Sequence, residues 1–229
     1  MKACLPQLHT EPFVLQRDWD ADGIPILSVS ISLPRPTVTG SGVSRRIRRF
    51  YELQARSYLR YCERWLLPEA ITEHHAALSS SSPLPHLHAS LSYCVTYNEN
   101  GFWSLYTQSC EPDTSGHPLF FRHGDTWDLA SGYPVSLSSF FPSRSRWKTQ
   151  LLKLAAQEIE HQESLGISSY HQEWRKELRR RFNQRNFYLT PEGLVFFFPM
   201  YSIAPAVERL PTFLVPYTVL RQSSFLPPT

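Results

Sequence analysis

Residues 26–34 read ILSVSISLP, and the alternation of apolar side chains with serines predicts a strand that buries one of its faces. Pro25 precedes this stretch, and Pro34 and Pro36 end it. A strand with one apolar face needs a covering layer, so the fold depends on the element that comes next along the chain.

A long amphipathic helix is predicted directly after this strand. The turn at residues 38–42 offers Ser41 or Ser44 as a cap, and apolar side chains then recur at helical spacing from residue 43 to 66, over about six turns. The apolar positions are Ile47, Phe50, Tyr51, Ala55, Tyr58, Leu59, Cys62, Trp65 and Leu66. The other face carries arginines, which predict a solvated face or, as the alternative, a surface for anions: Arg45, Arg46, Arg48, Arg49, Arg56, Arg60 and Arg64.

The middle of the chain predicts a loop and three strands. Residues 78–85, LSSSSPLP, predict the loop, and strands are predicted at 87–97 and 102–110. The segment between these strands contains Asn100-Gly101, which supplies the positive φ angles of a tight hairpin turn. Another strand is predicted at 119–129.

The C-terminal third predicts two helices followed by three strands. Gly166 closes the first helix, whose apolar face is formed by Trp147, Leu151, Leu154, Ala155 and Ile159. The second helix is predicted from Tyr170 to Phe182. Strands are predicted at 187–189, at 194–198 and at 212–220, the last interrupted by Pro216.

This order of elements predicts an α+β fold. We expect antiparallel sheets, a long helix in the N-terminal half and a helical pair packed on one face, and this order does not favour a parallel βαβ design. We expect two regions, an N-terminal α+β region at 1–110 and a C-terminal α+β region at 111–229, packed together as one unit.

Composition excludes several classes of protein. The chain has 229 residues with 41% hydrophobic and 14% aromatic side chains, which excludes a disordered chain. No apolar run approaches the ~18 residues of a membrane span, and no signal peptide is visible near Met1. We therefore expect a cytoplasmic chain as the sequence stands, or an extracellular one if Met1 is not the true start. The four cysteines form no C-x-x-C pair and predict free thiols, with a Cys94–Cys110 disulfide as the alternative in a secreted protein.

Charge and motifs give no catalytic assignment. The 23 basic and 20 acidic side chains leave a net charge of +3, which argues against a dedicated nucleic-acid binder. No glycine-rich phosphate loop and no G-x-S-x-G motif is present, so no cofactor is expected. His117, His123, Asp125 and Asp128 are of types suited to metal binding or acid–base chemistry, but their spacing forms no metal motif. We interpret them as solvent-facing polar residues and assign no metal site.

Two stretches carry a family resemblance, TWDLASGYPVSLSSFF at 126–141 and FYLTPEGLVFFF at 187–198, together with YSIAP at 201–205 and FLVPY at 213–217. Taken together they resemble the RsiV-like family, which includes the extracellular part of RsiV-type anti-sigma factors and a domain that accompanies peptidoglycan deacetylases. The upstream half resembles the companion N-terminal region of that family, so the resemblance extends roughly from Gly23 to Leu220. It implies a binding module without catalytic machinery, which in the anti-sigma factor captures lysozyme.

One turn departs from the family pattern. The family commonly shows T-G-G-A-H after the central hairpin, whereas this chain has DTSGHP at 113–118, with one glycine and the histidine kept.

We therefore expect a non-enzymatic binding or regulatory module whose ligand is a protein such as lysozyme or a cell-wall glycan such as a peptidoglycan fragment. The residues expected to bind it are Trp103, Ser115, Gly116, His117, Arg122 and Trp127, because Trp and Arg dominate protein interfaces and the turn keeps one glycine and the histidine of the family form. One alternative is a cell-wall glycan hydrolase or deacetylase accessory acting through Asp125, Asp128 or His117. Another is a cytoplasmic nucleic-acid-linked regulator using Arg45, Arg46, Arg48 and Arg49, whose binding would fall steeply with salt.

Overall fold

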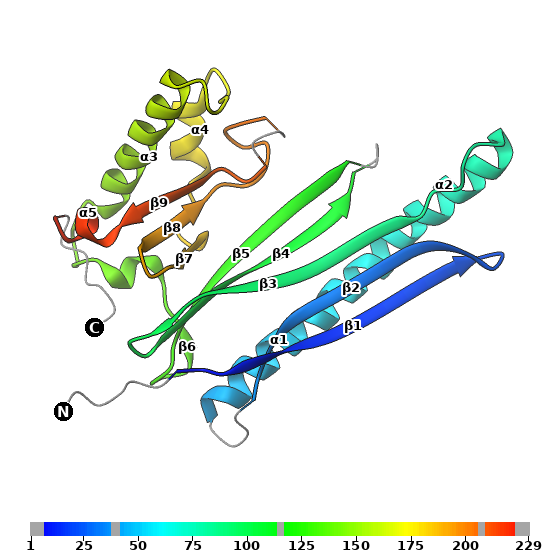
Figure 1. Cartoon of the computed structure of the whole chain (residues 1–229), viewed down its shortest axis with the longest axis horizontal. Helices are drawn as coiled ribbons and strands as arrows, with labels where there is room; N and C mark the ends of the chain where they lie inside the picture. The colour runs from blue at the N-terminus through cyan, green and yellow to red at the C-terminus, as the bar shows by residue number, and fades with distance from the viewer. Residues whose placement is uncertain (1–6, 38–41, 114–116, 206–208, 223–229) are drawn as a thin grey trace. The chain divides into compact units, whose positions relative to one another are not determined.

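A computed structural model describes residues 7–37, 42–113, 117–205 and 209–222 (Figure 1). The chain forms two compact units. Unit 1 combines residues up to 8 with residues 94–106 and those from 120 onward, and unit 2 combines residues 9–93 with 107–119. The predicted regions 1–110 and 111–229 differ from these units, because three strands each pass from one unit to the other. That the two predicted regions pack as one unit stays a prediction.

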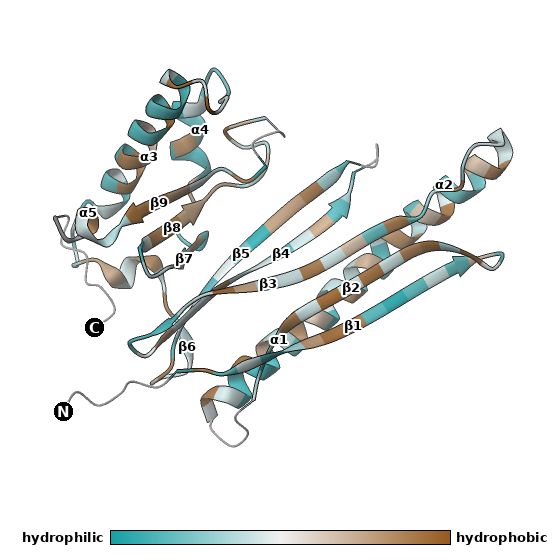
Figure 2. Cartoon of the chain, in the orientation of Figure 1, coloured by the Kyte–Doolittle hydropathy of each residue, from teal (hydrophilic) through white to brown (hydrophobic). Residues whose placement is uncertain are grey.

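A hairpin opens the described chain. Strands β1 (Thr10–Ala21) and β2 (Ile24–Pro36) pair antiparallel around Asp22 and Gly23, whose φ angles of 52° and 77° are those of a tight hairpin turn. The predicted strand is thus confirmed as part of β2, whose inward side chains Leu27, Val29, Ile31 and Leu33 are at most 2% exposed. Strand β1 was not predicted. Most of its side chains are exposed, and Figure 2 shows long hydrophilic stretches along it, so it has no clear apolar alternation.

The long helix is confirmed and is longer than expected. It consists of α1 (Gly42–Tyr61), the π-helical turn η1 (Cys62–Leu66) and α2 (Leu67–Ser80). Helical spacing was traced as far as Leu66, and the helix continues to Ser80 because the chain accommodates Pro68 without leaving the helix. Proline lacks an N–H and its ring clashes with the carbonyl four residues earlier, whereas a π turn does not require that bond. The helix ends at Ser81, whose φ of 55° is left-handed.

The helix connects two parallel strands. β2 pairs in parallel with β3 (Leu87–Glu99), with Leu27 opposite Leu87 and Ile31 opposite Leu91. This parallel pair was not predicted. Parallel neighbours need a long crossover connection, and the helix over residues 42–80 provides it.

The first sheet has the strand order β1-β2-β3-β4-β5-β6. Its remaining strands are β4 (Phe102–Pro112), β5 (Pro118–Asp128) and β6 (Tyr133–Pro134). The predicted turn between β3 and β4 is confirmed by Asn100 and Gly101, with φ angles of 53° and 77°.

The second sheet belongs to unit 1 and has the order β7-β8-β9, antiparallel throughout. Its strands are β7 (Phe187–Leu189), β8 (Gly193–Phe197) and β9 (Thr212–Pro216). The predicted last strand ends at Pro216 rather than at residue 220, and residues Tyr217–Gln222 form helix α5 instead. Proline cannot donate to a strand ladder, which is consistent with the strand ending there.

The predicted helical pair is confirmed as α3 (Trp147–Ser164) and α4 (Trp174–Arg181), preceded by the short 3-10 helix η2 (Leu137–Phe140). Gly166 follows α3 with a φ of 65°, as its predicted closing role requires. Leu151, Ala155 and Ile159 of α3 share one hydrophobic core with Phe196 and Phe213 of the second sheet. The expected α+β class is therefore confirmed, with one parallel strand pair added to the antiparallel ones.

Among the described helices, none is long and apolar enough to cross a lipid bilayer.

Candidate functional site

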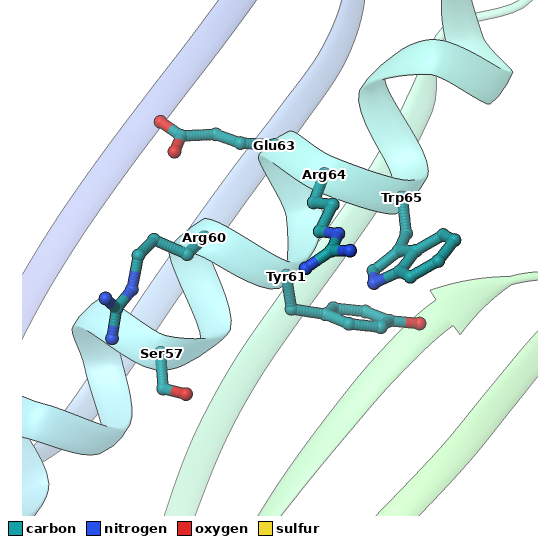
Figure 3. A pocket seen from close by; sticks show the side chains of 6 residues that line it. All are labelled: Ser57, Arg60, Tyr61, Glu63, Arg64 and Trp65. Atoms are coloured by element: carbon teal, nitrogen blue, oxygen red, sulfur yellow. The ribbon is translucent and has the colours of Figure 1, made fainter.

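The exposed side of the helix around η1 carries the candidate site, which lies entirely in unit 2 (Figure 3). We call it the Trp65 surface, a hollow of about 580 Å³ lined by Ser57, Arg60, Tyr61, Glu63, Arg64 and Trp65. Figure 3 shows Arg64 and Trp65 on the same side of the helix as Tyr61, while Glu63 points away from them.

The π turn accounts for the position of Trp65. An α-helix advances about 100° per residue, and a π turn holds an extra residue, so the side chains after it are rotated back relative to a continuous α-helix. The N–H of Leu67 bonds to the carbonyl of Cys62, five residues earlier. Leu66 is 5% exposed and Trp65 is 59% exposed. The prediction that Phe50 and Trp65 belong to the buried face was therefore wrong, since Phe50 is also 38% exposed.

The rings of the Trp65 surface are held in place by neighbours. The guanidinium carbon of Arg64 lies 5.2 Å from the centroid of the Trp65 ring, within the range of a cation–π contact. Tyr61, which is 40% exposed, donates a 2.8 Å hydrogen bond from its hydroxyl to Glu111 Oε2 of β4. Tyr58 stacks on Tyr61 with their centroids 6.1 Å apart. The surface is thus partly organised before any ligand arrives.

Three titratable side chains at or beneath this surface have raised pKa values, namely Tyr58, Tyr61 and Cys62. Burial raises the pKa of Tyr58 well above its usual range, and the nearby Glu111 carboxylate raises it further. The pKa of Tyr61 is raised to about 12, mainly by burial and to a lesser extent by the hydrogen bond to Glu111. Burial and Glu111 also raise the pKa of the Cys62 thiol to about 12. Since a thiolate is the reactive form of cysteine, the raised pKa disfavours covalent chemistry at Cys62.

The structure does not bring the predicted ligand-binding residues into one site. Trp103 is 0% and Trp127 is 2% exposed, so a partner can reach neither ring and neither enters the proposal below. Arg122 is half-buried, with its guanidinium carbon 4.1 Å from the Tyr106 ring centroid. His117 is exposed, and its backbone N–H donates to Asp113 Oδ1 at 2.7 Å. Ser115 and Gly116 lie outside the described residues.

The carboxylates nominated for an enzyme have structural partners. Asp128 Oδ1 accepts a 2.9 Å hydrogen bond from the N–H of Ala130, which fixes a turn. Asp125 is buried, and its Oδ1 lies 3.2 Å from His123 Nε2. Within the described ranges, no group of three or more histidine, cysteine or acidic side chains could hold a metal ion. Cys62, Cys94 and Cys110 are free thiols, and Cys4 lies outside the described residues.

The His123–Asp125 pair predicts a pH-dependent contribution to stability. The hydrogen bond to Asp125 raises the pKa of His123 above its ordinary value of 6.5, against the opposing effects of burial and of Arg185. A raised pKa in the folded state means that this stabilisation is complete below about pH 6.5 and is lost as the pH rises through the folded-state pKa. We expect the difference in Tm between the wild type and His123→Gln to be larger at about pH 6 than at about pH 9. A difference that stays constant between these pH values contradicts the assignment.

Tyr61, Arg64 and Trp65 were not predicted as a group. Helical spacing assigned Trp65 to the apolar face of an uninterrupted helix. The feature of the sequence that could have indicated the irregular turn is Pro68. It stands four residues after Arg64 and cannot donate the α-helical hydrogen bond to the carbonyl of Arg64.

Comparisons with known proteins support the fold. Residues 138–218 match the model of a family described as a protein of unknown function (DUF3298). A crystal structure of a DUF3298 family member from Bacteroides fragilis is similar at a TM-score of 0.69 and 13% identity, covering 94% of this chain and 93% of that chain. A DUF3298 family protein from Pseudomonas aeruginosa is similar at a TM-score of 0.61 and 14% identity, covering 97% of this chain and 96% of that one. No curated protein matches this chain in sequence.

These matches are consistent with an RsiV-like family, but the specific RsiV assignment is not confirmed. At 13% and 14% identity the two solved structures show a shared fold and assign no ligand.

Proposed function

We propose that this chain is a non-enzymatic module that binds a partner protein through the Trp65 surface. Trp, Tyr and Arg are the residue types that contribute most to the affinity of protein interfaces, and this surface places one of each side by side. The raised pKa values of Tyr61 and Cys62 keep both groups protonated, which supports a binding role rather than a catalytic one.

The exposed indole of Trp65 carries the proposal. A tryptophan offers about 200 Å² of surface, so leaving 59% of it in water forgoes roughly 3 kcal/mol of burial free energy. A partner that covers the ring recovers this free energy. Arg64 contacts the Trp65 ring and Glu111 binds the Tyr61 hydroxyl, so these side chains are already ordered in the free protein. The entropy cost of ordering side chains on binding is therefore small.

The resemblance to the RsiV-like family suggests which ligands to test first. Lysozyme represents a protein ligand, and soluble peptidoglycan fragments represent a glycan that would stack on the same rings. The alternative is nucleic-acid binding through the arginines of α1, and salt dependence distinguishes it from the proposal. The affinity for phosphates falls steeply as the salt concentration rises, whereas the affinity of contacts through apolar rings falls far less.

Replacing Trp65 with alanine should weaken binding about 30-fold, which corresponds to the ~2 kcal/mol of an interface hot spot. The measurement is a calorimetric titration of the full chain with lysozyme and with peptidoglycan fragments at low and high salt. The matched control is Phe121→Ala, which removes an aromatic ring that is 56% exposed and lies outside the Trp65 surface. If the wild type and Trp65→Ala bound a probe with equal affinity, the proposal that the probe binds through the Trp65 surface would be rejected. Arg122→Ala and His117→Ala in the same titrations test the two remaining sequence-based candidates.

A further inference from the structure

Helices α3 and α4 belong to unit 1 (Figure 1). They line a second surface, a groove of about 640 Å³. It is lined by Lys148, Thr149, Leu152, Lys153 and Ala156 of α3 and by Trp174, Arg175, Leu178 and Arg179 of α4. None of these residues belongs to the Trp65 surface.

The floor of the groove is apolar. Leu152 and Ala156 are four residues apart on α3, and Trp174 and Leu178 are four residues apart on α4, so each helix contributes one apolar row. Trp174 and Leu178 are both only 3% exposed. Both belong to the hydrophobic core of unit 1, so the apolar side chains that a ligand can reach in the groove are the half-buried Leu152 and Ala156.

The rim of the groove is basic. Arg175 Nη2 lies 2.9 Å from the Glu160 carboxylate, which shows that the rim already accepts one carboxylate of the chain itself. In the described part of the chain, no carboxylate lies within 4.0 Å of the charged groups of Lys148, Lys153 or Arg179. These three exposed cations lack a compensating anion there, and they surround an apolar floor.

We propose that this groove binds an acidic amphipathic helix of a partner protein. The apolar rows span four residues, about 6 Å along the helix axis, which fits one or two turns of a docked helix. Apolar side chains at helical spacing would lie on the floor, and glutamates or aspartates on either side would meet Lys148, Lys153 and Arg179.

The half-buried floor favours a peptide over the other anionic partners. A membrane surface takes up exposed apolar side chains, but Leu152 and Ala156 are half-buried between the basic side chains of the rim. A nucleic acid is bound mainly through its phosphates, and its backbone would leave the apolar floor without a function.

The test is a fluorescence-anisotropy titration of the full chain with a labelled helical peptide that carries leucines at positions i, i+3, i+4 and i+7 and glutamates on both flanks. We expect saturable binding. The variant Lys153→Gln/Arg179→Gln should weaken it about tenfold, since two rim charges are lost. The control Arg146→Gln/Lys176→Gln removes two cations of the same region that do not line the groove, and it should stay within about twofold of the wild type.

A charge-neutral variant tests the floor separately. Ala156→Gln lengthens a half-buried floor residue and should also weaken binding about tenfold, while thermal unfolding checks that the variant folds. Trp65→Ala should leave this affinity unchanged, which separates the groove from the proposed function of the Trp65 surface. Equal losses in the rim and control variants would overturn the proposal. So would rim-dependent binding of phosphatidylserine vesicles or duplex DNA in the absence of peptide binding.

Discussion

Replacing Phe196 with alanine should lower the free energy of unfolding by about 4 kcal/mol, within the range for a fully buried phenylalanine. Phe196 is 1% exposed, and its ring centroid lies 6.0 Å from that of Phe182, 6.1 Å from that of Phe198 and 5.5 Å from that of Phe213. Phe182 follows α4, Phe198 follows β8 and Phe213 lies in β9, so no single segment can move in to fill the cavity. The measurement is urea-induced unfolding followed by circular dichroism.

Two further variants calibrate this loss. Phe196→Leu keeps most of the apolar volume and should recover more than half of the stability. Phe121→Ala removes a ring that is 56% exposed, and its effect should stay below about 0.5 kcal/mol. If Phe196→Ala were as mild as Phe121→Ala, the aromatic cluster around β8 would not be the main stabilising core of unit 1.

Replacing Gly124 with alanine should cost about 3 kcal/mol or more, because the added methyl group meets backbone rather than a flexible side chain. An ideal Cβ at Gly124 would lie 1.9 Å from the carbonyl oxygen of Phe187 and 2.8 Å from its carbonyl carbon. Relief of this clash requires β5 or β7 to shift, and β7 is buried along its whole length. The same urea titration measures the loss.

Gly42→Ala is the matched control for this substitution. A Cβ at Gly42 meets no atom within 4 Å, and the residue begins α1, where alanine is the better helix former. We expect its effect to be neutral or stabilising by up to about 1 kcal/mol. If Gly124→Ala were as mild as Gly42→Ala, the close approach of β7 to Gly124 would not exist in solution.

Local patterns predicted most of the elements. The apolar-serine alternation of residues 26–34 became β2, the Asn100-Gly101 pair became the turn between β3 and β4, and Gly166 closed α3. Each of these patterns lies within a few neighbouring residues, so it can be recognised in the sequence without knowledge of the fold. The parallel pairing of β2 with β3 depends on segments separated by the whole helix, and no local pattern specifies it.

The candidate site was less predictable than the fold. Whether a tryptophan is a buried or an exposed ring depends on the rotation of its element. Trp65 was expected inside and is exposed, whereas Trp103 and Trp127 were expected to bind ligand and are buried. One π turn beside Pro68 is enough to move a side chain from the buried face of a helix to its exposed face. Composition revealed that the chain is rich in aromatic residues, but it could not reveal which of them are available to a partner.

The stretch that matches the DUF3298 model is smaller than the unit that must fold. The DUF3298 match spans residues 138–218, yet the core of that unit also contains Tyr97 and Leu137. The N–H of Leu189 donates at 2.9 Å to Ser104 Oγ, a buried bond that also crosses the boundary of the match. A gene fragment cut at those boundaries would encode an incomplete interior. The unit that folds therefore extends beyond the matched residues, and the two solved structures share the fold over 94% and 97% of the chain.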